Sequence, residues 1–316
     1  MLSALPAAGL SGPSRAASFP EKPISLVVPF GPGGATDIVA RTLAAEASAQ
    51  FNQPVVILNK PGASATIGTG EVFRAKPDGY TVLLADNIST VLQPQRMKLP
   101  YSGHESFDPV IRVGDVPNVL AVRADARWKT LADFVEDAKT RPGSIRVSTA
   151  GQYTGTDLNI LELNQIAGMN TLRVPIGGGT GEAVTLLLGG HVEAVVGAPA
   201  AIVSFAQAGK LRPLTVFSNQ RVALFPELPT TAESGYQTTM RVMVFVSAPK
   251  GLEPGTLRAL HDGFAAAVGG ERFRTFARSN GYLVDVKDST ALRRELDGWR
   301  GYFGGLMKRL GPDAAK

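Results

Sequence analysis

The sequence contains no cysteine, and it is poor in histidine, aromatic residues and long apolar runs. Without cysteine among its 316 residues, the chain has no disulfide, no thiol nucleophile and no thiolate metal ligand. No apolar run approaches the roughly 20 residues of a membrane-spanning helix, so we expect a soluble protein. The only histidines, at 104, 191 and 261, lie far apart and lack metal-ligand spacing.

Charge is also sparse, with 32 Lys and Arg against 27 Asp and Glu and a net charge of +5. The basic residues are spread along the chain, whereas nucleic-acid binding needs a concentrated basic face, so we expect no nucleic-acid partner. Carboxylates form no evident acid–base pair, and no G-x-S-x-G motif is present. We therefore nominate no catalytic residue and expect a binding protein without a cofactor, rather than an enzyme.

Residues 1–18 are rich in Ala, Ser, Gly and Pro and carry no charge before Arg15. An A-x-S pattern at residues 16–18 is typical of a processing site, but the usual basic start is missing and Pro6 interrupts the apolar stretch. The segment is either an incomplete secretion signal or a disordered N-terminus, and we favour the signal.

Short β-branched runs alternate with helical patterns along the whole chain, which favours βαβ units and an α/β fold with mostly parallel sheets. Thr130 and Asp133 fit a capping box for a helix that ends before Pro142 and Gly143. The strands are expected at residues 24–28, 55–58, 81–84, 119–122, 145–148, 172–175, 192–196, 214–217 and 242–247.

Two polar, proline-containing segments, residues 115–130 and 225–237, look like crossings between two lobes. We therefore expect one lobe to comprise residues 19–123 plus 233–316, and the other residues 124–232. Near the C-terminus, apolar residues recur at spacings of four and three and predict one long amphipathic helix. This helix either packs on its own sheet, which we favour, or forms a coiled coil. The stripe consists of Leu292, Leu296, Trp299, Phe303, Leu306 and Leu310.

The segment VVPFGPGGATDIVAR (residues 27–41) runs from a strand through a glycine-rich turn into a helix predicted over residues 37–48. Gly31, Gly33 and Gly34 let backbone N–H groups approach a ligand, and Thr36 is a good N-cap. Unpaired N–H groups and the helix dipole favour an anion at such a site. The loop lacks the lysine of a P-loop and the third glycine of a dinucleotide fingerprint. A simple strand-to-helix turn remains the alternative.

Three further strand-to-helix loops carry glycines or hydroxyls: residues 85–90 (ADNIST), 148–157 (STAGQYTGTD) and 176–181 (IGGGTG). Loops of this kind gather at the carboxyl ends of parallel strands, where open α/β sheets bind ligands. We therefore expect the four loops to converge on one cleft.

Several motifs, in order and spacing, resemble the solute receptors of tripartite tricarboxylate transporters, the Bug family, over about residues 19–311. They include PFGPGGATDIVAR, QPVVILNKPGASATIG, KPDGYTVLLAD, LLLGGHVEAVV and FPELPTTAESGY. The resemblance implies a two-lobed periplasmic binding protein of the Venus-flytrap type, with a hinge of crossing segments. It also implies a small organic carboxylate as ligand, membrane permease subunits as partners, and a location in the periplasm. We expect a monomer.

The resemblance places a ligand carboxylate against the loop from Phe30 to Thr36, and the second lobe contributes from residues 150–156 and from the Gly177 region. Together with the other convergent loops, the candidate ligand-binding residues are Phe30, Gly33, Gly34, Ala35, Thr36, Asn87, Ser89, Gly151, Gln152, Thr154, Thr156, Gly177 and Gly197. No metal ligand is among them.

The chain departs from the family pattern at three places. Ile176 stands where a Tyr is common, Thr156–Asp157 where Ser-His is common, and Gly197 where an Asp usually faces the ligand. The loss of that Asp disfavours an amino-acid ligand and leaves room for a bulkier or purely acidic one. Asp157 either supplies a substitute charge at the cleft rim or only caps its helix.

The ligand stays open among mono-, di- and tricarboxylates and aromatic acids. Three other functions also stay open: an orphan receptor for a signalling partner, an enzyme acting on a phosphorylated or acyl substrate, and a nucleotide-binding regulatory module.

Overall fold

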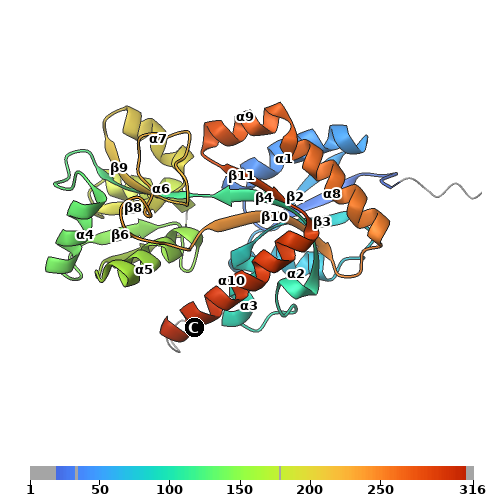
Figure 1. Cartoon of the computed structure of the whole chain (residues 1–316), viewed down its shortest axis with the longest axis horizontal. Helices are drawn as coiled ribbons and strands as arrows, with labels where there is room; N and C mark the ends of the chain where they lie inside the picture. The colour runs from blue at the N-terminus through green and yellow to red at the C-terminus, as the bar shows by residue number, and fades with distance from the viewer. Residues whose placement is uncertain (1–18, 33–34, 178, 311–316) are drawn as a thin grey trace, which may run out of the picture.

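The computed structural model describes residues 19–32, 35–177 and 179–310. Within these ranges the chain forms two α/β lobes side by side, each built around its own sheet (Figure 1). The segment predicted to be a secretion signal or a disordered N-terminus, residues 1–18, lies outside the described residues. No helix in the described part of the chain is long and apolar enough to cross a membrane.

The first lobe contains a six-stranded sheet in the order β11-β4-β10-β3-β1-β2. The strands β2, β1 and β3 run parallel to one another, whereas β10, β4 and β11 add antiparallel pairs. The strands are β1 (Ile24–Val28), β2 (Val55–Asn59), β3 (Thr81–Asp86), β4 (Phe107–Val116), β10 (Val242–Pro249) and β11 (Leu283–Lys287).

The second lobe contains a five-stranded sheet in the order β7-β6-β8-β5-β9. Here β7, β6 and β8 are parallel, and β5 pairs antiparallel with both β8 and β9. The strands are β5 (Asn118–Arg123), β6 (Arg146–Thr149), β7 (Leu172–Pro175), β8 (Ala194–Gly197) and β9 (Leu211–Phe217).

The two-lobed α/β architecture is confirmed, but the sheets are mixed rather than mostly parallel. The reason lies in the strands that carry the chain between the lobes. β4 leaves the first lobe and β10 returns to it, so the two run antiparallel within the first sheet. In the same way β5 enters the second lobe and β9 leaves it, and these two strands are also antiparallel. Between the named strands, parallel pairing occurs within the βαβ units.

The crossings lie at Pro117, between β4 and β5, and at residues 218–241, between β9 and β10. The sequence placed residues 118–123 with the first lobe, but these residues form β5 of the second sheet. We therefore propose lobe boundaries at Pro117 and within residues 218–241, in place of 123/124 and 232/233.

Helices cover both faces of each sheet. In the first lobe, α1 (Ala35–Phe51), α8 (Pro254–Gly269) and α9 (Glu271–Asn280) cover one face. The other face carries α2 (Thr66–Phe73), the π-helix η1 (Ile88–Leu92), α3 (Gln93–Arg96), a short 3-10 turn η2 (His104–Ser106) and α10 (Ser289–Leu310). In the second lobe, α4 (Leu131–Thr140) and α5 (Gly155–Ala167) cover one face, and α6 (Gly179–Leu188) and α7 (Pro199–Gln207) the other.

Several local predictions are confirmed. Thr130 Oγ1 accepts from the Asp133 amide, and the Asp133 carboxylate accepts from the Thr130 amide, which completes the capping box of α4. The apolar stripe of α10 is buried from Leu292 to Leu306 and packs on the first lobe rather than forming a coiled-coil seam within these residues. The sequence missed β4 and β11. Pro109, Arg112 and Asp115 interrupt the apolar pattern of β4, and Arg112 is buried only because charged partners surround it.

Candidate ligand-binding site

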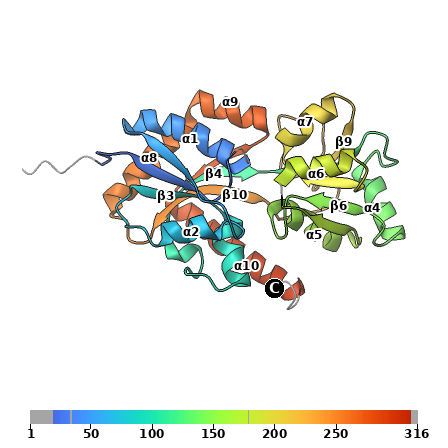
Figure 2. The same cartoon turned by 180° about the vertical axis from the view of Figure 1, so that it is seen from behind.

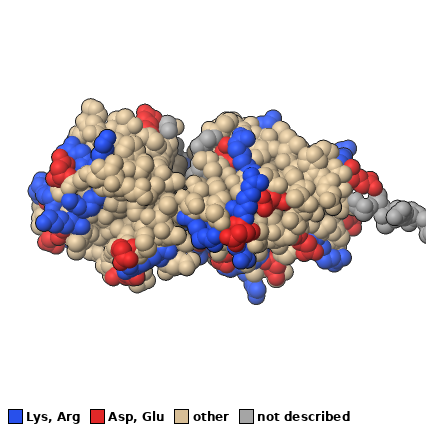
Figure 3. All heavy atoms as spheres, turned by 90° about the horizontal axis from the view of Figure 1, so that it is seen from above, with Lys and Arg blue, Asp and Glu red and all other residues tan. Residues whose placement is uncertain are grey.

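The topology brings the predicted loops to the space between the lobes. The parallel strands β1, β2 and β3 end at the edge of the first sheet from which β4 departs for the second lobe. The carboxyl ends of β6, β7 and β8 lie at the edge of the second sheet where β5 enters. The loops after these strands therefore border the same gap. Figure 3 shows a groove between the two lobes, and in Figure 2 the helices α1 and α6 approach this gap from opposite sides.

The turn after β1 is supported from the neighbouring strand. Asn59, the last residue of β2, donates from Nδ2 to the carbonyl of Phe30 (3.0 Å) and to Asp37 Oδ1 (2.8 Å). Asp37 is buried in the first turn of α1 and also accepts from Arg41 Nε at 2.8 Å. Sequence reasoning missed Asn59. Asn59 is recognised from the parallel register of β1 and β2, which sets it beside Val28, just before the glycine-rich turn.

The helix that follows this turn begins earlier than predicted. It starts at Ala35, so half-buried Thr36 is the second helical residue rather than the N-cap. Phe30 is half-buried and packs against the core of the first lobe. The predicted contacts Gly33 and Gly34 lie outside the described residues.

Asn87 and Ser89 are buried and engaged by protein partners. Asn87 donates from Nδ2 to the carbonyl of Arg241 (3.0 Å) and accepts at Oδ1 from the Met243 amide (3.0 Å). Ser89 Oγ donates to the carbonyl of Asp86 at 3.3 Å. We therefore assign these two residues to support of the loop and of the second crossing, and not to ligand contact.

Hydroxyl groups organise the loop between β6 and α5. Thr154, the N-cap of α5, donates from Oγ1 to the carbonyl of Gly151 (2.8 Å), and Thr156 Oγ1 accepts from the Ala150 amide (2.9 Å). Gly151 needs the conformational freedom of glycine, because its φ is +137°. Gln152 is exposed, and Gly151 lies next to the carbonyl of Ile176, so this loop adjoins the one after β7.

Asp157 does not supply a charge at the cleft rim. It is fully buried, accepts from the Tyr153 amide at 2.9 Å and pairs with Arg173 Nη1 at 2.6 Å. Burial raises the pKa of Asp157, although Arg173 and the Tyr153 amide act in the opposite direction. Of the two roles expected from the sequence, the geometry favours capping of α5.

Gly177 and Gly197 differ in their surroundings. Gly177 is exposed, and a Cβ at this position would meet no atom within 4 Å. Gly197 is buried at the end of β8, and a Cβ there would overlap Cγ2 of Thr180. Thr180 of α6 thus fills the space beside Gly197. The expectation that glycine in place of the usual Asp leaves room for a bulkier ligand is therefore not supported by this geometry.

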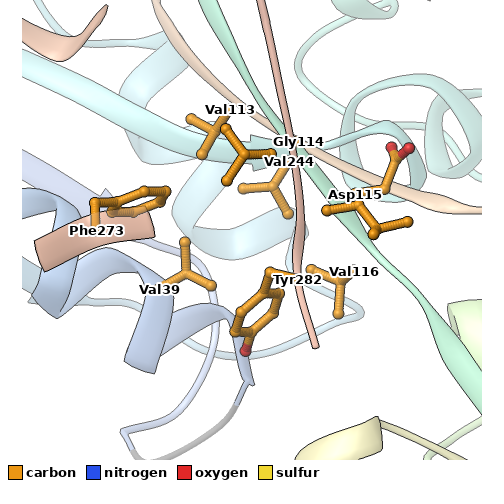
Figure 4. A pocket seen from close by; sticks show the side chains of 10 residues that line it. Val39, Val113, Gly114, Asp115, Val116, Val244, Phe273 and Tyr282 are labelled. Carbon is orange, nitrogen blue, oxygen red and sulfur yellow. The ribbon is translucent and has the colours of Figure 1, made fainter. Parts of the chain in front are cut away.

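A small cavity lies inside the first lobe between β4, β10, β11, α1 and α9 (Figure 4). Its walls are mostly apolar, and the carboxylate of Asp115 is paired with Arg112 and Arg241. Its volume of about 20 Å³ is enough for about one water molecule, whereas ligand pockets measure roughly 300–1,000 Å³. This cavity is therefore not the ligand site. Among the residues that the structure describes, no cluster of His, Asp and Glu could hold a metal ion.

Comparisons with known proteins agree with this geometry. A family model described as "Tripartite tricarboxylate transporter family receptor" (TctC) matches residues 39–296. BugT of Bordetella pertussis is 32% identical over 299 residues, which cover 88% of this chain and 90% of BugT. The periplasmic binding protein BugD is 30% identical with a TM-score of 0.79, over 93% of this chain and 99% of BugD. R. palustris Rpa4515, solved with adipate, is 27% identical with a TM-score of 0.80, over 94% of this chain and 98% of its own.

Proposed function

The chain belongs to the tripartite tricarboxylate transporter receptor family, and on this premise we propose that it captures a small organic carboxylate between its two lobes. It is a solute-binding receptor of the Bug type and not an enzyme. Its family places it in the periplasm, where it would deliver the ligand to the membrane permease subunits of a tripartite tricarboxylate-type transporter.

The observation that carries this proposal is the chemistry of the loops that border the gap. They offer backbone groups, glycines and hydroxyls, and two of their carboxylates are paired: Asp37 with Arg41 and Asn59, and Asp157 with Arg173. Glu182, in the first turn of α6, is exposed to solvent. The N-terminal ends of α1 and α6 also lie toward the gap, and helix N-termini favour negative charge. Donors of this kind, beside carboxylates that are already paired, suit an anion.

The proposed ligand contacts come from both lobes. The first lobe contributes the turn after β1 and the start of α1, held by Asn59. The second lobe contributes the loops after β6, β7 and β8. The contacts are Phe30, Gly33, Gly34, Ala35, Thr36, Gly151, Gln152, Thr154, Thr156, Gly177 and Gly197.

A thermal-shift screen tests the function and names the ligand class. Adipate, the ligand in the Rpa4515 structure, should be compared with malate, citrate, benzoate, amino acids and nucleotides. A ligand at 100 times its dissociation constant stabilises a protein by about 2.7 kcal/mol, which corresponds to a rise of several degrees in Tm. A shift with one carboxylate class supports the proposal, whereas a shift with nucleotides alone contradicts it.

Replacing Thr36 with alanine is expected to weaken carboxylate binding about fivefold. The hydroxyl lies in the first turn of α1, and one lost hydrogen bond to a ligand costs about 1 kcal/mol. Isothermal titration calorimetry with the carboxylate found in the screen measures this change. Thr42→Ala, on the same helix and bonded to the carbonyl of Ile38, is the matched control and should bind like the wild type. Equal affinities for the wild type and both variants would show that the Thr36 hydroxyl does not contact the ligand.

A further inference from the structure

The second crossing is held by side chains that come from the helix bearing the ligand loop of the second lobe. Asn159 and Glu162 lie one turn apart on α5, and both are buried. Asn159 donates from Nδ2 to the carbonyl of Met240 at 2.8 Å. Glu162 accepts from the amides of Thr239 (3.0 Å) and Met240 (2.8 Å). These partners lie in the crossing just before β10.

The same asparagine also holds the first crossing. Asn118, the first residue of β5 after Pro117, donates from Nδ2 to Asn159 Oδ1 at 2.7 Å, and both side chains are buried. A single amide group therefore joins both connections between the lobes to one helix. Since a buried amide left without partners costs about 1–3 kcal/mol, these bonds should persist through any movement of the lobes.

The helix α5 also reaches the first lobe directly. Glu162 Oε1 accepts from the hydroxyl of Tyr302 on α10 at 2.8 Å, and Leu158 and Leu161 of α5 belong to the apolar cluster that contains Trp299 and Phe303. At its N-terminal end, Gly155 packs so closely on Val242 that a Cβ would overlap Val242 Cγ2. The start of α5 is thus fixed against the point where the crossing becomes β10.

The contacts of α5 connect the crossings between the lobes with the proposed ligand site. The N-terminal residues of α5 and the turn before them, including Thr154 and Thr156, form the loop that we assign to the ligand. On the first-lobe side, Asn87 of the loop after β3 holds Arg241, the last residue of the crossing, and Met243 of β10. A helix of the second lobe and a loop of the first lobe therefore hold neighbouring residues where the second crossing enters β10.

We propose that Asn159, assisted by Glu162, is a positioning residue for ligand capture. By fixing α5 to both crossings, Asn159 couples the angle between the lobes to the position of residues 150–156, so that one changes with the other. The lobes then turn at Pro117 and between Met240, which α5 holds, and Arg241, which Asn87 holds, as expected for a hinge of a few residues. The effect of Asn159 on ligand capture rests on the proposed function, whereas its effect on the angle between the lobes does not.

The test uses the full chain with one spin label on each lobe. Because the chain has no cysteine, Gln207→Cys on α7 and Arg258→Cys on α8, both at exposed positions, provide unique attachment sites. Double electron–electron resonance then reports the distribution of distances between the lobes, without ligand and with adipate. The variant is Asn159→Leu. Its matched control is Asn164→Leu on the same helix, because the Asn164 side chain bonds to Thr171, which also lies in the second lobe.

We expect Asn159→Leu to broaden the distance distribution of the ligand-free protein and to weaken adipate binding about tenfold. Asn164→Leu should leave both unchanged even where it lowers Tm. A wild-type distribution in Asn159→Leu would overturn the proposal, whatever its Tm. If that variant does not fold, Asn159→Asp decides in the same way, since it keeps the acceptor for Asn118 and loses the donor to Met240. Should adipate fail to bind the wild type, the ligand choice is wrong, but the ligand-free distances still decide this proposal.

Discussion

Replacing Arg112 with alanine is expected to lower the free energy of unfolding by about 3 kcal/mol, because it removes the buried cation at the centre of a cluster of partly buried carboxylates. Arg112 lies on β4 and its side chain is 1% exposed. Its guanidinium pairs with Asp115 at 2.7 Å and with Asp285 at 2.5 Å. Its Nε lies 3.2 Å from Glu295 Oε2 but makes no hydrogen bond there.

The remaining cations cannot replace Arg112. Arg241 lies 3.4 Å from Asp115 and 3.3 Å from Glu295, and Lys287 lies 2.8 Å from Glu295. These two side chains reach the carboxylates from the rim, so alanine at 112 would leave the centre of the cluster negative. Urea unfolding at pH 7 measures the loss. Arg300→Ala, which removes a half-exposed pair with Asp297, is the control and should cost about 0–1 kcal/mol.

The deficit of Arg112→Ala should be smaller at pH 5 than at pH 7. Burial already raises the pKa of Asp115, and Arg112 is the largest influence that lowers it. Without Arg112 this pKa rises further, so the folded variant binds a proton that the unfolded chain has released. A carboxyl group with a raised folded-state pKa contributes stability at low pH that is lost as the pH rises through that pKa. An equal deficit at both pH values would show that lost packing, and not charge, causes the effect.

Replacing Gly114 with alanine is expected to lower the free energy of unfolding by about 3 kcal/mol, at the upper end of the usual cost of overpacking. Gly114 lies in β4 between its two neighbours and is paired with Val244 of β10 and Val284 of β11. A Cβ there would overlap the carbonyl oxygen of Leu283 and lie 3.1 Å from Cα of Val284. Because the obstacle is backbone, β11 must move away from β4.

The displacement of β11 should weaken two further interactions. Asp285 on β11 would lose its short contact with Arg112, and Leu283 would withdraw from the core of the second lobe, against which it packs. Chemical denaturation measures the total effect. Gly298→Ala, at an exposed position of α10 where a Cβ meets no atom within 4 Å, is the control. It should stabilise the protein by about 0.5–1 kcal/mol through helix propensity. A Gly114→Ala variant as stable as the wild type would mean that the edge strand adapts freely.

Local patterns predicted the parts of the fold that local chemistry governs. The strands of the βαβ units, the capping box at Thr130 and the stripe of α10 follow from alternation, hydrogen-bonding side chains and helical spacing, and all are present. The strand β4 was missed because its charged and small residues make sense only beside β10, β11 and α10. Long-range partners, not the residues of the strand, make Arg112 a core residue.

The candidate site divides in the same way. Sequence identified the glycine-rich and hydroxyl-rich loops and, through the motifs around residues 30–41, the receptor family. The sequence could not show that the side chains of Asn87 and Ser89 bond to the protein backbone, since the same residues could equally well face the gap between the lobes. Nor could the sequence show that Thr180 fills the space beside Gly197 or that Asp157 pairs with Arg173, because both contacts depend on a neighbouring element.

The sequence by itself determined most of the strands and helices and the family to which the chain belongs, because these properties are carried by short runs of residues. Only the tertiary structure decided how the crossing strands pair and that Asn159 joins both crossings to one helix. Antiparallel pairing, and buried hydrogen bonds between residues 41 and 81 positions apart, depend on the path of the whole chain and not on any local sequence pattern.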